Sequence, residues 1–234
     1  MMDTKSLVAA VSAAALGLAA SAASAGVVVS IGGTALAGQG QTSAFNGQAG
    51  YTTFDFNSVA LESLQAPYSG NGRVVVNSLG GQYATPQTGA NPNTSRYLAV
   101  PKQTSGTMAV TVIAPTLSNY FGLWWGSVDN YNSIAFFNGS TQVASYTGGT
   151  LLAFPDPDLT PGAQSQAAYF NFTFNGGDAF DRVVLTSTQF ALESDNHVFG
   201  TSVVPVPGAA ALMMSGILAM LFAVRRQRKN LQVA

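Results

Sequence analysis

The stretch "AYFNFTF", residues 168–174, decides the fold class, because its polar and apolar residues alternate. A period of two places Phe170, Phe172 and Phe174 on one face of a strand and the residues between them on the other. The stretch "YTTFDFN", residues 51–57, shows the same alternation. Both patterns are typical of strands that are buried on one side.

Further short strands follow the same pattern and are separated by turn signals such as "SGNG", "FNGS" and "FNGGD". We expect them at residues 73–77, 97–100, 107–113, 120–127, 132–137, 142–146, 180–188 and 189–193. No sustained helical stripe lies between the two ends of the chain. The sequence therefore predicts an all-β protein, an antiparallel β-sandwich of jelly-roll type.

The sandwich is expected over residues 51–202, preceded by a flexible lead-in at residues 26–50. That lead-in has no periodicity and is rich in Gly and Gln, a composition typical of loosely docked segments. A second irregular stretch, residues 151–167, is a long loop marked by prolines. Loops of this length either carry function or cross between the sheets of a sandwich.

The N-terminus has the organisation of a secretory signal peptide, residues 1–25. Lys5 precedes an apolar run, and the small-residue triplet from Ala23 to Ala25 predicts cleavage after Ala25. An uncleaved N-terminal anchor is the alternative. Cleavage would leave the sandwich outside the cytoplasm.

The C-terminus predicts a single transmembrane helix at residues 208–224, a stretch of 17 residues without a charge. At ~1.5 Å per residue such a helix is about 26 Å long, just enough to cross the hydrocarbon core. The basic tail 225–234 follows, and because basic clusters stay cytoplasmic, the bulk of the chain is expected outside.

The segment "VPVPGAAALMMSGILAMLFAVRRQRK", residues 204–229, resembles the PEP-CTERM sorting signal of Gram-negative bacteria. In that family a V-P-x-P motif precedes a short helix and an Arg-rich cluster, and the tag is removed by the membrane protease exosortase. The matching residues are Val204, Pro205, Pro207, Gly216, Arg225 and Arg226. Val206 departs from the family, which usually carries Glu there. The resemblance implies that segment 203–234, with its motif at 204–207, is a removable tag, and a permanent anchor is the alternative.

The stretch from residue 119 to residue 148, "NYFGLWWGSVDNYNSIAFFNGSTQVASYTG", extends this resemblance. It looks like exosortase-dependent surface proteins whose jelly-roll domain precedes such a tag. Those proteins occur in organisms that make extracellular polysaccharide. The resemblance implies a protein held by its C-terminal helix in the inner membrane and then presented at the cell surface or in the matrix.

Composition excludes several other classes. Residues 26–202 contain four Lys and Arg against nine Asp and Glu, a net charge of −5, so the domain is not a nucleic-acid binder. The chain has no cysteine and therefore no disulfides, although it is expected to be exported. The core alone must stabilise the domain.

Catalysis is not predicted. His197 is the chain's single histidine, and we expect it at a strand end or a turn rather than beside a nucleophile. Glycoside hydrolysis needs two carboxyl groups across a cleft. The candidate pairs are Asp156/Asp158, Asp178/Asp181 and Glu193/Asp195, all expected at turns. A polysaccharide-modifying enzyme remains the alternative to a structural or polysaccharide-interacting protein.

Aromatic residues make carbohydrate binding the leading hypothesis, because sugar rings stack on exposed aromatic faces. The candidates are Trp124, Trp125 and Tyr131. Since Trp124 and Trp125 are adjacent on a predicted strand, one should enter the core and the other should face outward or into a groove. The alternative is that both are structural, with the outward ring covered by a loop.

A calcium site is the one cofactor that the sequence suggests. Asp55, Asp195 and Asn196 carry oxygen ligands of the kind that Ca²⁺ prefers. They would meet if the first and last strands of the sandwich pair. The predicted partners are thus exosortase, the inner membrane and extracellular polysaccharide, with no cofactor beyond this calcium candidate.

Overall fold

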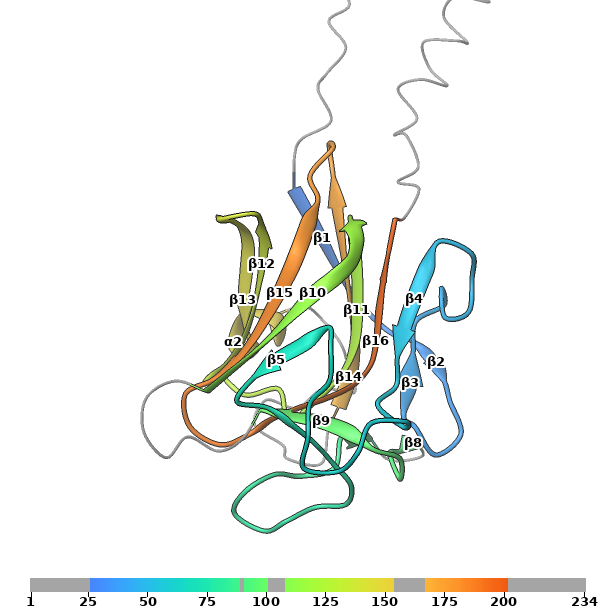
Figure 1. Cartoon of the computed structure of the whole chain (residues 1–234), viewed down its shortest axis with the longest axis vertical. Helices are drawn as coiled ribbons and strands as arrows, with labels where there is room; N and C mark the ends of the chain where they lie inside the picture. Colours follow the sequence, from blue (N-terminus) through green and yellow to red (C-terminus); the bar gives the residue numbers. More distant parts are fainter. Residues whose placement is uncertain (1–25, 89–90, 101–107, 154–166, 202–234) are drawn as a thin grey trace, which may run out of the picture.

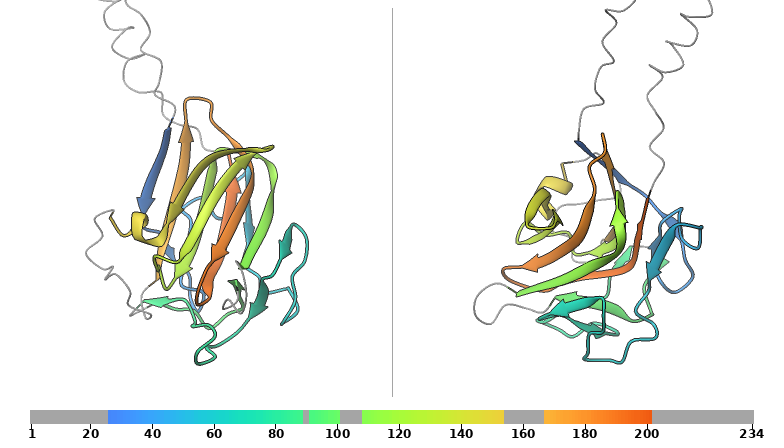
Figure 2. Two further views of the ribbon diagram at one scale, coloured as in Figure 1. Left: turned by 90° about the vertical axis from the view of Figure 1, so that its left-hand side faces the viewer. Right: turned by 45° about the horizontal axis from the view of Figure 1, so that its top comes forward.

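The computed structural model describes residues 26–88, 91–100, 108–153 and 167–201, and in these ranges the chain is an antiparallel β-sandwich (Figures 1 and 2). None of its helices in these ranges is long and apolar enough to cross a membrane. The predicted signal peptide 1–25 and the sorting segment 203–234 lie outside the described residues, as does the pair Asp156/Asp158.

Two sheets form the layers of the sandwich. The larger sheet contains, in spatial order, β1 (Gly26–Ile31), β14 (Ala167–Asn175), β11 (Tyr120–Gly126), β16 (Leu192–Gly200), β9 (Tyr97–Val100) and β6 (Arg73–Val75), and β4 (Tyr51–Phe54) also pairs with β16. The smaller sheet contains β13 (Thr141–Thr147), β12 (Asn132–Asn138), β15 (Phe180–Ser187), β10 (Met108–Ser118) and β5 (Tyr68–Gly70). Short pieces complete the described structure: β2 (Thr34–Ala35), β3 (Gln41–Thr42), β7 (Gln87–Thr88), β8 (Asn91–Pro92) and α2 (Gly148–Leu151).

The spatial order of the last eight strands, β9 to β16, shows the topology of the sandwich. The larger sheet carries the order β14-β11-β16-β9, and the smaller sheet carries β13-β12-β15-β10. The chain therefore changes sheet at almost every connection, as two interlocked Greek keys require. This is the connectivity of a jelly roll, and the predicted antiparallel sandwich is confirmed.

The core forms where the inward faces of β14 and β12 meet. Phe170, Phe172 and Phe174 of β14 are all buried there, as the alternation in the sequence predicted. Phe136 of β12 packs against Phe172 and Phe174, with ring centroids 5.1 Å apart in each pair. Tilted and edge-on pairs of this kind stabilise a core beyond the area that they bury.

Most strand bounds agree with the sequence. β9 has the predicted bounds, and β6, β11, β12, β13 and β15 end within two residues of their predicted ends. β10 is longer than predicted and reaches Ser118. The strand expected at residues 189–193 is wrong, because the chain bends at residues 188–190 and β16 begins only at Leu192.

The flexible lead-in predicted at residues 26–50 is also wrong. β1 pairs along its whole length with β14 at the edge of the larger sheet (Figure 2, left). The following residues cover the outer face of that sheet, where the Asn196 side chain donates hydrogen bonds to the carbonyl oxygens of Gln39 and Gln41. The sandwich therefore begins at Gly26 rather than at residue 51.

Glycine gives this covering segment its close fit. Gly40 has a φ of +70°, and a side chain there would overlap the indole of Trp124. A Gly-rich, Gln-rich composition predicts flexibility only when its backbone has no partners. Here the missing side chains let the backbone lie directly on aromatic rings.

β16 occupies the centre of the larger sheet, although its residues "LESDNHVFG" are unusually polar. It pairs with β11 on one side, and on the other side with β9 over its first half and with β4 over its second half. A bulge opposite β11 coincides with Asn196, whose φ is +51°. Glu193, Asp195 and His197 lie within this strand and are buried, so their predicted position at turns or a strand end is wrong.

Candidate functional site

A cleft of about 400 Å³ lies at the end of the sandwich where β16 begins. Three described segments line it: the loop after β6 with the start of β7 (residues 78–87), the turn between β11 and β12 (residues 127–131), and the residues that lead into β16 (residues 190–193). These segments are far apart in sequence, and the pairing of β16 with β11 and β9 brings them together. We refer to this space as the polar cleft.

Aromatic rings form part of its wall. The rings of Tyr131 and Phe190 lie 6.2 Å apart between centroids and are inclined at 60° to each other. Phe190 is 44% exposed, an unusual position for a phenyl ring, and Tyr131 is half-buried. Tyr83 adds a third ring from the loop after β6. The wall thus offers apolar surfaces of the kind that sugar rings pack against.

Two carboxyl groups also line the cleft. Glu193 is 2% exposed, and its Oε1 accepts a hydrogen bond of 2.8 Å from the backbone N–H of Ala84. Its Oε2 is buried and has no hydrogen-bond partner. Asp129 accepts a hydrogen bond of 2.6 Å from the hydroxyl of Tyr131.

Burial governs the acidity of Glu193. Desolvation raises the pKa of Glu193 to about 8, the N–H of Ala84 opposes this, and the negative charge of Asp129 adds to it. At neutral pH Glu193 is therefore mostly protonated. A carboxylic acid of this kind can donate as well as accept a hydrogen bond.

The loop over the cleft is braced from within and from behind. The hydroxyl of Ser78 accepts from the N–H of Thr85 at 2.9 Å, and the N–H of Leu79 donates to the carbonyl of Tyr83 at 2.9 Å. Arg73 supports it by donating to Gln82 at 3.2 Å. A braced loop loses little freedom when a ligand binds.

The predicted tryptophan platforms do not face solvent. Trp124 and Trp125 point to opposite faces of β11, as their adjacency required, but both have 0% exposure. Trp125 belongs to the main core. Trp124 lies beneath Gly40 and donates from Nε1 to the carbonyl of Pro86 at 3.4 Å. Both rings therefore have a structural role, which was the alternative to glycan binding. Of the three predicted glycan-stacking residues, only Tyr131 lines the polar cleft.

The residues proposed for calcium do come close together, because β4 pairs with β16. Asp195 is fully buried, however, and its Oδ2 accepts hydrogen bonds from Asn93 at 2.6 Å and from Ser95 at 3.2 Å. Its Oδ1 accepts from the N–H of Asn196 at 2.7 Å. Across the described ranges no group of three His, Cys, Asp or Glu could hold a metal ion. Both carboxylate oxygens of Asp195 therefore have hydrogen-bond donors from the protein.

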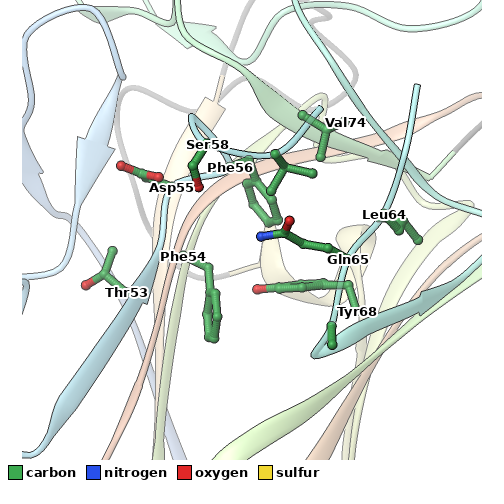
Figure 3. A pocket seen from close by; sticks show the side chains of 11 residues that line it. Thr53, Phe54, Asp55, Phe56, Ser58, Leu64, Gln65, Tyr68 and Val74 are labelled. Carbon is green, nitrogen blue, oxygen red and sulfur yellow. The ribbon is translucent and has the colours of Figure 1, made fainter. Parts of the chain in front are cut away.

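His197 lies in the core beside a second, smaller cavity of about 100 Å³. Figure 3 shows the rings of Phe54, Phe56 and Tyr68 around this cavity, while the carboxyl group of Asp55 points away from it. His197 Nδ1 lies 3.0 Å from the Tyr68 hydroxyl, and its Nε2 lies 3.0 Å from Ser194 Oγ.

This Ser194–His197 pair has the spacing of a nucleophile and its base, but both residues have 0% exposure. Desolvation lowers the pKa of His197 to about 3, so the ring stays neutral. No substrate reaches either atom. His197 therefore has a structural place in the core, inside the strand rather than at its end.

Sequence reasoning found one residue of the polar cleft, Tyr131, and missed Phe190, Asp129 and Glu193 as a group. The sequence suggests Glu193 only as one of two carboxyl groups at a predicted turn, the other being Asp195. In the structure both lie on the outer face of β16 and have different hydrogen-bond partners. One signal was present: Ala191-Leu192 and Val198-Phe199 flank the polar run, which is typical of a buried strand interrupted by function.

Comparisons with known proteins were made by sequence and by structure. No family model matches the chain, and no curated protein matches it. A family 29 carbohydrate-binding module from Piromyces equi has 8% identity and a TM-score of 0.34, covering 67% of this chain and 95% of the module. A family 29 module complexed with mannohexaose has 13% identity and a TM-score of 0.34, covering 66% and 97%. The K2 adhesin domain of Lys-gingipain has 11% identity and a TM-score of 0.33, covering 74% and 99%. With TM-scores below 0.5, these likenesses say nothing about what this chain binds.

Proposed function

We propose that the protein is an exported surface or matrix protein whose sandwich binds carbohydrate in the polar cleft. The observation that carries the proposal is the meeting of partly exposed rings, Tyr131 and Phe190, with hydrogen-bonding groups in one braced hollow. A sugar presents C–H faces to rings and hydroxyl groups to polar side chains, so it uses both kinds of surface. The proposed role is binding, and a polysaccharide-modifying enzyme is the alternative.

The position of the cleft supports a surface role. Gly126 pairs with Glu193 at one end of β16, and Tyr120 pairs with Gly200 at the other. Gly26 also lies at the Gly200 end, because it pairs with Asn175 and Tyr120 pairs with Thr173. Both described chain ends are thus at the top of Figure 1, and the loop after β6 is at the bottom. A protein held by its C-terminal segment would present the cleft away from the membrane.

The binding role is tested by changing Phe190 to Ala. Removing a partly exposed ring should cost little stability but should weaken retention in gels that contain a bound polysaccharide by about tenfold, or ~1.4 kcal/mol. Affinity electrophoresis of the full chain, purified in detergent, against a panel of neutral, amino and acidic polysaccharides measures this.

The matched control is Leu117→Ala, which removes an exposed apolar side chain (59%, against 44% for Phe190) from β10. It should be retained like the wild type. The binding role would be contradicted if both changes weakened retention equally, or if no polysaccharide retained the wild type. Release of new reducing ends in the same incubation would instead favour the hydrolase alternative.

For delivery, we propose that segment 203–234 is a sorting tag that exosortase removes. The support is the sequence: the V-P-x-P motif at 204–207, the apolar stretch 208–224 and the basic tail. A simple anchor needs only apolar length and flanking charge. A signal read by a protease needs the motif, because Pro205 and Pro207 bias the residues before them toward the extended shape that proteases bind.

The two explanations of this segment differ in a measurable way. In a host with its own exosortase, mass spectrometry of the mature wild-type protein should find no residues from 208 onward. The double change Pro205→Ala and Pro207→Ala should accumulate uncleaved in the inner membrane. An intact tail through Ala234 on most of the wild-type protein would reduce the segment to a permanent anchor, with Val206 as the departure to examine first.

A further inference from the structure

The acids that line the polar cleft have no base beside them in the described lining. The described lining includes the carboxyl groups of Glu193 and Asp129 and contains no Lys, Arg or His. The guanidinium group of Arg73 lies over the Tyr83 ring, 5.6 Å from its centroid, but its ion-pair partner is Glu62 at 2.9 Å, and it also donates to Gln82 at 3.2 Å. No described base of the protein therefore balances the acids that line the cleft.

Glu193 Oε2 is an unusual atom within this cleft. A buried polar atom almost always has a hydrogen-bond partner, because leaving it without one costs free energy. Oε1 of the same side chain has its partner in the N–H of Ala84, so the side chain is held in place. Oε2 is left without a partner on a residue that lines the cleft. A ligand group that donates hydrogen bonds would complete it.

The acids of the cleft favour one kind of hydrogen-bond donor on the ligand over another. A hydroxyl group would leave Glu193 protonated and the negative charge of Asp129 unbalanced. A protonated amine beside Glu193 would favour release of the carboxyl proton to solvent, would donate to Oε2 of the resulting carboxylate, and would compensate both acids. The rings of Tyr131 and Phe190 favour the same choice, since aromatic faces attract cations as well as sugar C–H groups.

Building on the proposed function, we propose that the sugar seated in the polar cleft carries a free amine, so that the ligand is a deacetylated amino-sugar polymer. The amine lies against Glu193 Oε2, and the sugar ring packs on the exposed face of Phe190. N-acetylation removes the positive charge and adds a bulky group at the same atom. An acidic polysaccharide brings further negative charge into the cleft. Both are therefore weaker ligands.

The test compares two ligands that differ only at this nitrogen. Calorimetric titration of the full chain in detergent uses a glucosamine hexamer and an N-acetylglucosamine hexamer at about pH 6, where the amines are protonated. The glucosamine hexamer should bind at least about tenfold more tightly. Glu193→Gln keeps the acceptor for Ala84 but cannot become a carboxylate when the amine binds, so it should abolish the difference between the two ligands.

A matched control separates the cleft from the general acidity of the domain. Asp178→Asn removes one charge at the turn between β14 and β15, away from the cleft, and should leave the preference for the amine unchanged. Asp129→Asn is a second cleft variant that keeps the acceptor for Tyr131, and it should reduce the preference severalfold. It keeps the test decisive if Glu193→Gln does not fold.

The results separate a failure of the amine preference from a failure of carbohydrate binding itself. Equal binding of the two hexamers, tighter binding of the acetylated one, or a preference that survives both cleft variants would overturn the amine while leaving carbohydrate binding intact. If neither hexamer binds, and the wild type is also retained by no polysaccharide in the panel, the binding role itself falls.

Discussion

Replacing Phe172 by Asp is expected to leave the domain unfolded at 25 °C. Phe172 has 0% exposure and packs against Phe136 of the opposite sheet. Loss of a buried aromatic ring alone costs about 3–5 kcal/mol, and burying a charge in its place costs more. A domain of this size is stable by only about 5–15 kcal/mol. Circular dichroism should therefore show that the strand signal of the wild type is lost.

Two controls make this result specific to the core face. Phe172→Leu keeps an apolar side chain and should fold with a lower melting temperature. Thr173→Asp places the same charge on the opposite face of β14, where the side chain is half-buried, and should fold as well. A folded Phe172→Asp variant with an unchanged melting temperature would contradict the position of this residue in the core.

The second large effect is a pH dependence that comes from Glu193. Its pKa is raised from 4.5 to about 8, chiefly by desolvation, so the folded state holds a proton that the unfolded state releases at a lower pH. The stability that this proton contributes is present below about pH 4.5 and is lost as the pH rises through about 8. Glu193→Gln does not titrate and should keep its stability over the same range.

The measurement is the free energy of unfolding of both proteins between about pH 5 and pH 9. The variant should gain on the wild type by ~4 kcal/mol across this window, the equivalent of the shift in pKa. Asp195 and His197 also have shifted pKa values, but they are common to both proteins, so the difference isolates Glu193. Parallel curves for the two proteins would contradict the buried, protonated state of this carboxyl group.

Much of the sandwich could be predicted from sequence because most of its strands are buried on one face only. The alternation of polar and apolar residues then shows which side chains form the core, as it does for Phe170, Phe172 and Phe174. Glycine and asparagine turns between such strands set the spacing. Under these conditions the side-chain period of two is sufficient to find a strand and to say which side of it is buried.

β16 could not be predicted in this way, because both of its faces are covered and many of its buried residues are polar. Asp195 has donors from Asn93 and Ser95, and Asn196 is bound by the covering segment, so polar residues are buried there without alternation. Each of these partners comes from a distant part of the chain. The phase of the strand also changes at the bulge, which one sequence alone does not reveal.

The polar cleft escaped prediction for a related reason. Phe190 and Glu193 are close in sequence, but Tyr131 and the loop after β6 reach them only through the pairing of β16 with two neighbours. Conversely, the most conspicuous aromatic residues, Trp124 and Trp125, are covered on both sides. A ring's exposure depends on what lies over it, and that is set by segments remote from the ring.

β16 also determines how the molecule would carry a mechanical load. Glu193 stands near its first residue and Gly200 is its last, so a pull between a ligand in the cleft and the C-terminal end of the domain would run along this one strand. β11 flanks it on one side, and β9 and β4 flank it on the other. Force along the strand loads these hydrogen bonds in shear, so that many must break together, whereas force across a sheet edge would open them one after another. In the proposed function, this central strand would carry the tension between the bound glycan and the C-terminal end of the domain.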